Sequence, residues 1–486
     1  MDDDDDDEKF IESLMMKDDK TNKSGVAKNN NNNQGSCTKI QKVDKSKMMT
    51  KNEIKKYYFP QMIAIGPTHA EYHEKNNQNK NNLKKILVKK FIKDGGNLEA
   101  RSLLKEIKEK FTLDEQNKLF HEKVKTKLNQ GQLARMLFQD GCVVLQFIHS
   151  YVNGEIIEFN EISIAEIDQI CQDLLLVENQ IPFEVLVILM RLSKIGSDLA
   201  KSVYHFISMN IMAPDIFYEK RLNHNLSRVP ANPEELFRGN NMLRLPVHLL
   251  DLLRSELLYE EEQEQECRDP PIPDDDHKPE REKIKNKGDA SAHSSSYYQR
   301  SFRNVQDLKE VDIKLKANYS KGLKSVSFSS TSLFFSPTLK LPPLIVDNST
   351  KQKLLNLVAY EMFPDNNKRN YAIASYVRLL DSLIDCEKDV KDLRSAHILR
   401  NLLGSDKEVA ELFNNISYIN LGPKHDIYVD VKKQIQKHYQ KKWSSWTAEF
   451  HQQHCRNPST FFAFLVGLVI LVATCIQAIY TVIQAE

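Results

Sequence analysis

One stretch near the end of the chain limits what it can fold into more than any other feature. Residues 461–483 read FFAFLVGLVILVATCIQAIYTVI, and none of these 23 residues is charged. As a helix the stretch would be about 35 Å long, and about 20 apolar residues cross the hydrocarbon core of a bilayer. A buried helix of this length normally keeps a polar stripe, and only Thr474, Gln477 and Thr481 could supply one. The stretch therefore predicts one C-terminal transmembrane helix.

The two ends of the chain predict the side of the membrane that the rest occupies. The first residues, MDDDDDDEKF, are the opposite of a secretory signal, which needs a basic start and an apolar centre. Arg456 and several lysines precede the apolar stretch, whereas only Glu486 follows it, in agreement with the positive-inside rule. We expect a single-pass protein with a cytosolic N-terminal body, held in the plasma membrane or an endomembrane by residues 456–486.

Cysteines and glycosylation sequons lead to a further expectation about the compartment. The seven cysteines form no CxxC pair and no spacing suited to zinc, which is typical of a reducing compartment. The five Asn-x-Ser/Thr sequons lie at Asn22, Asn225, Asn318, Asn348 and Asn415. A cytosolic body is not exposed to glycosylation, so we expect none of them to carry a glycan.

Charge is distributed in blocks. The net charge of +1 excludes a general affinity for nucleic acid through charge. Residues 1–50 are acidic and then rich in Lys and Asn, and residues 259–300 are charged and rich in Pro and Ser. Such segments bury too little apolar surface to offset the entropy of ordering. We expect a disordered tail over 1–50 and a disordered linker or inserted loop over 259–300.

The remaining segments have the pattern of helices. Apolar residues recur at helical spacing in 51–258 and in 301–455, which predicts an N-terminal and a C-terminal helical lobe. The sequence SIAE at 163–166 has the form of a capping box and predicts a helix start. Pro182 suits the beginning of a helix, so we expect a new helix over 183–192.

Strand patterns are confined to the second lobe. Alternation and β-favouring residues predict a small β element at 311–315, 325–335 and 339–346. The predicted fold class is therefore mostly α: a multi-helical soluble body with a small β element, followed by one C-terminal transmembrane helix.

The last helix before the span, over 427–454, carries an aromatic stripe that includes Trp443 and Trp446. It could lie on an anionic leaflet with the tryptophans in the interface. We favour the alternative, in which the stripe packs on the body and the lysines face solvent. Within the span, Ala463 and Gly467 are small residues four apart, a spacing that would permit a homodimer.

One catalytic arrangement can be drawn from the sequence. Cys142 would be the nucleophile, with His69 or His73 as its base and Asp140 orienting the base. However, Cys142 begins the apolar run CVVL, which fits a buried structural thiol better.

A second set of polar residues has the spacing of a shared helical face. Asp381, Asp385 and Asp389 could bind a hard cation, but neighbouring lysines favour a solvated face, or a helix break with Asp385 as its cap. The sequence has no P-loop, GxGxxG, HExxH or GxSxG motif. We therefore assign no catalytic residue, no cofactor and no metal.

Several phrases of the sequence match, in order, the motifs of a plant family. The longest is DLLLVENQIPF at 173–183, and IGPTH at 65–69 and DGC at 140–142 precede it. The phrases that follow are HLLDLL at 248–253, LLNLVAYE at 354–361, LLGSDKEVA at 402–410 and Asn457-Pro458. On these motifs the chain resembles the plant domain of unknown function 247 family, the UPF0481-type membrane proteins.

The resemblance marks residues to which we assign structural roles. The motif residues are Gly66, Pro67, His69, Asp140, Gly141, Cys142, Glu178, Asn179, Gln180 and Pro182. The membrane anchor is marked by Phe461, Gly467 and Ile483. Thr68, Ala70 and Glu71 depart from the family pattern, which has a Tyr, a second His and a Gly there.

The resemblance also implies a function. It indicates a plant membrane-anchored recognition or signalling protein without catalysis, whose partners are the membrane and another protein. Family members in grasses are associated with self-incompatibility loci, so a role in self-pollen recognition is one hypothesis. The alternatives are a hydrolase or transferase that uses Cys142 and His69, and a general growth or stress adaptor.

Overall fold

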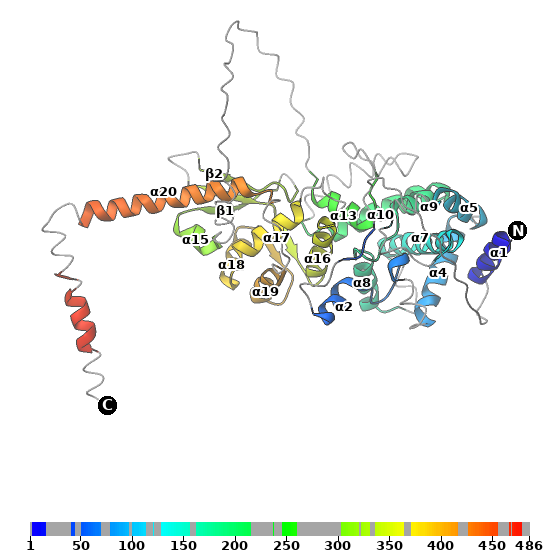
Figure 1. The fold of residues 1–486 in the computed structure, drawn as a ribbon, viewed down its shortest axis with the longest axis horizontal. Coiled ribbons are helices and arrows are strands. Elements are labelled where there is room, and N and C mark those ends of the chain that lie inside the picture. Colours follow the sequence, from blue (N-terminus) through cyan, green and yellow to red (C-terminus); the bar gives the residue numbers. More distant parts are fainter. Residues whose placement is uncertain are drawn as a thin grey trace, which may run out of the picture.

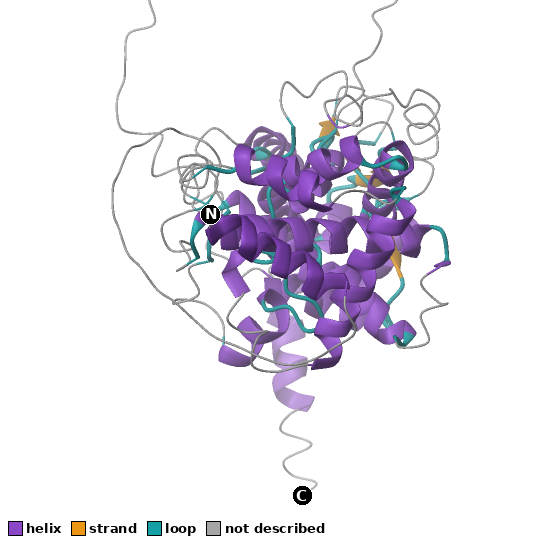
Figure 2. Cartoon of the chain, turned by 90° about the vertical axis from the view of Figure 1, so that its right-hand side faces the viewer, coloured by secondary structure: helices purple, strands orange, loops and turns teal. Residues whose placement is uncertain are grey.

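The fold is described from a computed structural model of the 486-residue chain. The described residues are 2–15, 40–43, 50–69, 78–96, 100–112, 120, 128–155, 162–214, 237, 245–259, 303–319, 322–330, 336–363, 371–416, 426–454, 466–467 and 469–478. Helices dominate, and the few strands lie in the C-terminal half (Figures 1 and 2). The prediction of a mostly helical chain with a small β element is confirmed.

The N-terminal half is built around α7 (Gln130–Val152), whose buried residues are mostly apolar. The helices packed against α7 are α4 (Gln78–Asp94), α5 (Ala100–Lys110), α9 (Phe183–Leu192) and α10 (Gly196–Asn210). Gly141 allows α7 and α9 to approach closely, because a Cβ there would lie 2.6 Å from Leu189 Cδ1. The helix predicted over 183–192 is confirmed as α9.

A shorter helix, α8 (Ile164–Asp173), completes this half. The Ser163 hydroxyl accepts a hydrogen bond from the backbone of Glu166, whose carboxylate accepts one from the backbone of Ser163. The predicted capping box is therefore confirmed, and it satisfies two backbone groups that the first turn would leave unpaired.

The acidic start of the chain is ordered, contrary to the prediction. Residues 2–15 form helix α1 (Asp2–Met15), which packs on α4, α5 and α7. Phe10 and Ile11 pack against the core and Leu14 is buried. The prediction of a disordered tail is wrong for this part of 1–50, because acids at a helix start are stabilised by the helix dipole and because basic residues of the body pair with them.

The ion pairs of α1 join it to two helices. Asp7 lies 3.1 Å from Arg135 of α7 and 3.2 Å from Lys108 of α5. Glu8 also pairs with Arg101 of α5. No local pattern in the acidic run could have indicated these partners, since they lie about a hundred positions further along the chain.

The C-terminal half contains two small sheets. In the first, β3 (Thr338–Leu341) lies between β1 (Lys314–Ala317), to which it is parallel, and β2 (Ser327–Ser329), to which it is antiparallel. In the second, β4 (Leu344–Val346) pairs in parallel with β5 (Leu399–Asn401). The strands fall in or beside the predicted β segments except β5, which is too short to show an alternating pattern.

Helices cover these sheets. They are α15 (Val305–Glu310), α16 (Thr350–Glu361), α17 (Ala372–Leu383), α18 (Glu387–Ser395) and α19 (Asp406–Ile416). The hydrophobic core continues from this half into the N-terminal half. Helix α2 (Lys51–Tyr58) lies at the junction and packs on α16, while α13 (Leu249–Leu257) packs on α10 (Figure 1). Of the predicted linker over 259–300, residues 260–300 lie outside the described residues.

Helix α20 (Val429–His454) begins on the body and then runs away from it (Figure 1). Ile435 is buried, and the guanidinium of Arg303 lies 3.7 Å from the ring centroid of Tyr439. The first part of the predicted stripe therefore packs on the body. The side chains of Trp443 and Trp446 lie outside the described residues.

The predicted membrane span is described only in part. Within 461–483 the described residues are 466–467 and 469–478, all helical, so Phe461 and Ile483 fall outside them. In the described portion of the chain, no helix is both long and apolar enough to cross a membrane.

Candidate functional site

The family motifs meet in space as a buried set of polar side chains, and Asp173 is its first member. Its carboxylate accepts hydrogen bonds from the backbone N–H groups of Gln61, Met62 and Ile63 at 3.0, 2.6 and 2.9 Å. Burial, the largest influence, raises the pKa of Asp173, and these hydrogen bonds oppose it. One carboxylate at the end of α8 thus fixes the extended segment that follows α2.

Asn179 fixes the same segment from the other side. Its Oδ1 accepts a hydrogen bond from the Ile65 N–H at 2.8 Å, and its Nδ2 donates to the carbonyls of Ile63 and Asp173 at 3.0 and 2.9 Å. The amide is fully buried and provides both acceptor and donor, as its chemistry allows.

Gln180 supports the turn after α8. Its Nε2 donates to the carbonyls of Leu174 and Leu176 at 2.9 and 2.7 Å, and its Oε1 accepts from the Leu250 N–H at 3.3 Å. The two amides thus bond backbone groups of three separate segments.

Gly66 and Asp140 join the segment to α7. Asp140 accepts from the Gly66 N–H at 2.9 Å and from the Lys84 ammonium at 2.6 Å. Gly66 has φ +71°, and a Cβ there would lie 2.3 Å from the Gln180 carbonyl oxygen. Only glycine fits this position, both for its backbone angle and for its close approach.

His69 and Glu178 lie at the edge of this set. Glu178 accepts a hydrogen bond from the Val43 N–H at 2.7 Å, and its second oxygen lies 3.6 Å from His69 Nε2. The His69 ring also packs on Phe59, with centroids 4.8 Å apart. Both side chains are buried. We call the six side chains Asp140, Asp173, Glu178, Asn179, Gln180 and His69 the motif network.

The geometry at Cys142 opposes nucleophilic chemistry. Its side chain is 0% exposed in the core, and burial raises the pKa of its thiol well above the ordinary value. A cysteine nucleophile reacts as the thiolate, which this environment disfavours. Cys142 thus has the surroundings of a structural thiol.

The three aspartates that were considered as a cation site do not share a helical face. Helix α17 ends at Leu383 and α18 starts at Glu387, so Asp381 and Asp389 belong to different helices. Asp389 accepts hydrogen bonds from the backbone N–H groups of Asp385 and Cys386, each at 3.0 Å. The arrangement of the three aspartates on one helical face is therefore wrong, because Asp389 caps a new helix. The structure shows the helix break that was also considered, but with Cys386 and not Asp385 at the N-cap of α18.

Two buried polar groups that the sequence did not single out connect the two halves. Asn356 of α16 accepts from the Val177 N–H at 2.9 Å and donates to the Tyr57 carbonyl at 2.8 Å. Glu361, 0% exposed, accepts from Arg254 Nε and Nη2 at 2.9 and 2.7 Å and from the Ala374 N–H at 2.9 Å. Their only sequence signal was a polar residue within the apolar phrase LLNLVAYE.

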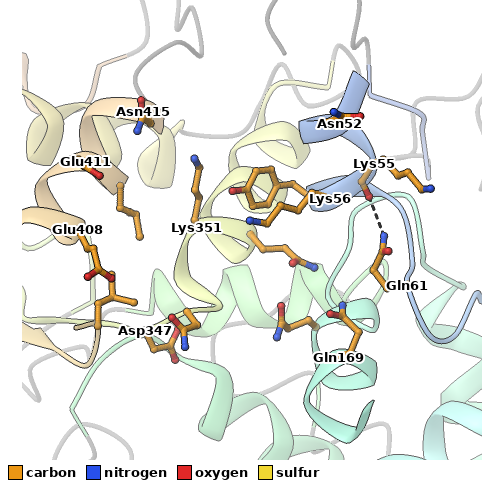
Figure 3. A pocket seen from close by; sticks show the side chains of 16 residues that line it. Asn52, Lys55, Lys56, Gln61, Gln169, Asp347, Lys351, Glu408, Glu411 and Asn415 are labelled. Atoms are coloured by element: carbon orange, nitrogen blue, oxygen red, sulfur yellow. Dashed lines mark hydrogen bonds between the residues drawn. The ribbon is translucent and has the colours of Figure 1, made fainter. Parts of the chain in front are cut away.

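A polar cleft of about 780 Å³ opens where the two halves meet (Figure 3). This volume lies within the range of ligand pockets, about 300–1,000 Å³. Helices α2 and α8 line one side, and α16 and α19 line the other. None of the ten family-motif residues lines it. Its lining residues with ionic side chains are Lys55, Lys56, Asp347, Lys351, Glu408 and Glu411.

The charges in the cleft are separated. Figure 3 shows Glu408 and Glu411 on one wall and Lys56 on the opposite wall, with Lys351 between them. The ammonium groups of Lys56 and Lys351 lie 5.2 and 5.1 Å from the ring centroid of Tyr57, so both approach the same aromatic ring. Asp347 is already used, since it accepts hydrogen bonds from Ser349 and caps α16.

Comparison with known proteins agrees with the motif resemblance. UPF0481 protein At3g47200 of Arabidopsis thaliana is 27% identical over 440 residues, 88% of this chain and 83% of that protein. Putative UPF0481 protein At3g02645 of the same plant is 27% identical over 173 residues, 36% of this chain and 32% of that protein. No solved structure matches. Residues 40–473 match the family described as plant protein of unknown function, DUF247. The chain therefore belongs to the plant DUF247 family.

Proposed function

We propose that this protein is a plant membrane-anchored recognition or signalling protein that acts by binding and not by catalysis. The observation that carries the proposal is the use of the motif network: its side chains bond backbone groups in the interior. Polar groups committed in this way hold a fold, whereas catalytic groups must reach a substrate.

Substitution of His69 and Cys142 tests the absence of catalysis. We expect His69→Ala and Cys142→Ala to lower stability or change nothing, and a thiolate-selective probe to leave Cys142 unlabelled in the folded full chain. Labelling of Cys142 at neutral pH, with the fold intact, would support the hydrolase or transferase alternative.

The anchor is proposed to be residues 461–483. Its described helical part exposes large apolar side chains: Val469 and Leu471 are each 62% exposed. Exposed apolar surface of this kind favours a lipid or protein environment. The body is proposed to lie in the cytosol, and the Gly467 face is open for homodimer pairing, since a Cβ there would meet nothing within 4 Å.

Membrane fractionation tests the anchor. The full chain is expected to stay in the membrane pellet after alkaline carbonate extraction, and a chain ending at residue 455 to be released. Protease added to sealed vesicles should remove the body from cytosol-facing vesicles, and deglycosidase should leave its mass unchanged. Release of the full chain by carbonate would refute the anchor.

A role in self-pollen recognition is the finer proposal, supported by the family alone. Reciprocal exchange of this gene between compatible lines should then alter pollination outcomes. Unchanged outcomes would remove the self-incompatibility role and leave a growth or stress adaptor as the recognition function. Proximity labelling in the expressing tissue would identify the protein partner and the membrane together.

A further inference from the structure

We infer that the polar cleft between the two halves binds a short peptide segment of a partner protein, one that carries both acidic and basic side chains. The inference deepens the proposed recognition function and rests on it. The occupant is identified by three features of the lining: a basic side, an acidic side, and a set of amides between them.

The basic groups are Lys56 of α2 and Lys351 of α16, and Lys351 lies between the two walls (Figure 3). Within the part of the chain that the structure describes, neither ammonium group pairs with a carboxylate. Both ammonium groups lie close to the Tyr57 ring, at 5.2 and 5.1 Å from its centroid. Lys351 is half-buried, so its charge is less screened than that of a fully exposed lysine. The charge of Lys351 also acts on the Glu53 carboxylate, but neither lysine forms an ion pair within the described residues, which favours an acidic side chain of the ligand.

The acidic side is one face of α19. Glu408, Glu411 and Asn415 recur at three- and four-residue spacing and all line the cleft. Glu408 accepts a bond from the Ser405 hydroxyl at 3.1 Å, while Glu411 makes only a long contact of 3.8 Å with exposed Lys407. Glu411 is therefore available for a basic side chain of the ligand.

Amide side chains supply the remaining polar groups. Those that line the cleft are Asn52, Gln61, Gln169, Gln172, Asn348, Gln352 and Asn415. Gln61 already donates to the Lys55 and Phe59 carbonyls, and Gln169 donates to Asp173. The other five amides carry both donors and an acceptor, which match the alternating N–H and C=O groups of an extended peptide. A polyphosphate has no such donors, and the negative charge of a polyphosphate or an anionic lipid headgroup would face Glu408 and Glu411, so the lining favours a peptide.

Binding of peptide pools to the full chain tests the inference. The probes are fluorescein-labelled heptapeptide pools: one with two acidic and one basic position fixed, one with acids only, one with bases only and one neutral. Fluorescence anisotropy is measured on the full-length chain in detergent. The mixed-charge pool should bind at least ten-fold more tightly than the neutral pool.

Charge reversal on each side assigns the contacts. Lys351→Glu should weaken the mixed and acidic pools at least ten-fold, and Glu411→Lys should weaken the mixed pool while it strengthens the acidic pool. Lys105→Glu, at an exposed position of α5, is the matched control and should leave all pools unchanged.

Three outcomes would overturn the inference: equal binding of all four pools, unchanged binding by Lys351→Glu, or full displacement of the peptides by inorganic phosphate, which would indicate a simple anion site. None of these touches the proposed function, which fails separately if the full chain leaves the membrane in carbonate or if Cys142 is labelled as a thiolate.

Discussion

Two polar regions of this protein lie close together and are used in opposite ways. In the motif network, Asp173 and Asn179 direct their polar atoms inward, to the backbone of 61–65. In the cleft, the side chains of Lys351 and Glu411 line an open space and bond no backbone group within the described residues. Gln169 borders both, since it lines the cleft and donates to Asp173 at 3.2 Å. The family motifs thus mark how the chain folds, and the cleft that we propose for binding lies beside them.

The largest effect that would sharpen this comparison is expected at the Arg254–Glu361 pair. Arg254→Ala leaves the carboxylate of Glu361 buried without its charged partner, which should lower the free energy of unfolding by about 3–5 kcal/mol. The exposed pair Arg394–Asp406, at 2.7 Å, is the control: Arg394→Ala should cost less than about 1 kcal/mol. Urea unfolding of the full chain measures both. Equal losses would show that burial does not separate the two pairs.

The next largest effect on stability is expected at Asp173. Asp173→Ala removes the acceptor of three backbone N–H groups, so we expect a loss of about 3 kcal/mol. Asp168→Ala changes an exposed carboxylate of the same helix and should alter stability by about 0.5 kcal/mol or less. If the two variants unfolded at the same urea concentration, Asp173 would not hold the 61–63 segment.

The raised pKa of Asp173 adds a pH dependence. Because its pKa is above the ordinary 3.8 in the folded chain, the folded state binds more protons, and its contribution to stability falls as pH rises through the window above 3.8. Asp173→Asn cannot titrate and loses this dependence. The stability advantage of the wild-type chain over Asp173→Asn should therefore be larger near pH 4 than near pH 7. The reverse order would contradict the raised pKa.

Substitution of Gly66 tests the close approach of its backbone to the Gln180 carbonyl. Gly66→Ala places a Cβ 2.3 Å from the Gln180 carbonyl at φ +71° and should cost about 2–3 kcal/mol. Gly154 has nearly the same angle, φ +74°, with nothing within 4 Å. Gly154→Ala should therefore cost only the backbone strain, about 1 kcal/mol. Equal melting temperatures for the two variants would mean that the contact with Gln180 adds nothing.

The smallest effect is expected at α1, whose acids pair with basic side chains near the surface. Raising salt to about 1 M shortens the screening length to about 3 Å, which should weaken the pairs of Asp7 and speed amide exchange over 2–15. Exchange within α7 should stay unchanged and serves as the internal control. Identical exchange of α1 at low and high salt would show that its apolar side alone, through Phe10 and Leu14, holds it.

The sequence predicted local features well where the signal was local. The capping box at Ser163 and the helix after Pro182 depend on neighbouring residues, and both were confirmed. The break before Asp389 was left as one of two possibilities, because the hydrogen bonds that cap α18 cannot be read from spacing. The docking of α1 was missed for a related reason: Arg135 lies far along the chain.

The candidate site could likewise be predicted from the sequence only in part. The motif residues could be found from their order in the chain, but not the fact that Gly66, Asp140 and Asn179 meet around one backbone segment. The cleft could not be predicted at all. Its walls come from α2, α8, α16 and α19, which begin at residues 51, 164, 350 and 406, and no periodic pattern connects them.

The most direct test of the central claim compares one variant from each region in the same full-length chain. Asn179→Ala should lower the free energy of unfolding by about 2–3 kcal/mol and leave the affinity of the folded protein for the mixed-charge peptide pool unchanged. Lys351→Glu should leave unfolding within about 0.5 kcal/mol of wild type and abolish peptide binding. The opposite pattern, with Asn179→Ala stable but unable to bind and Lys351→Glu binding normally, would contradict the account.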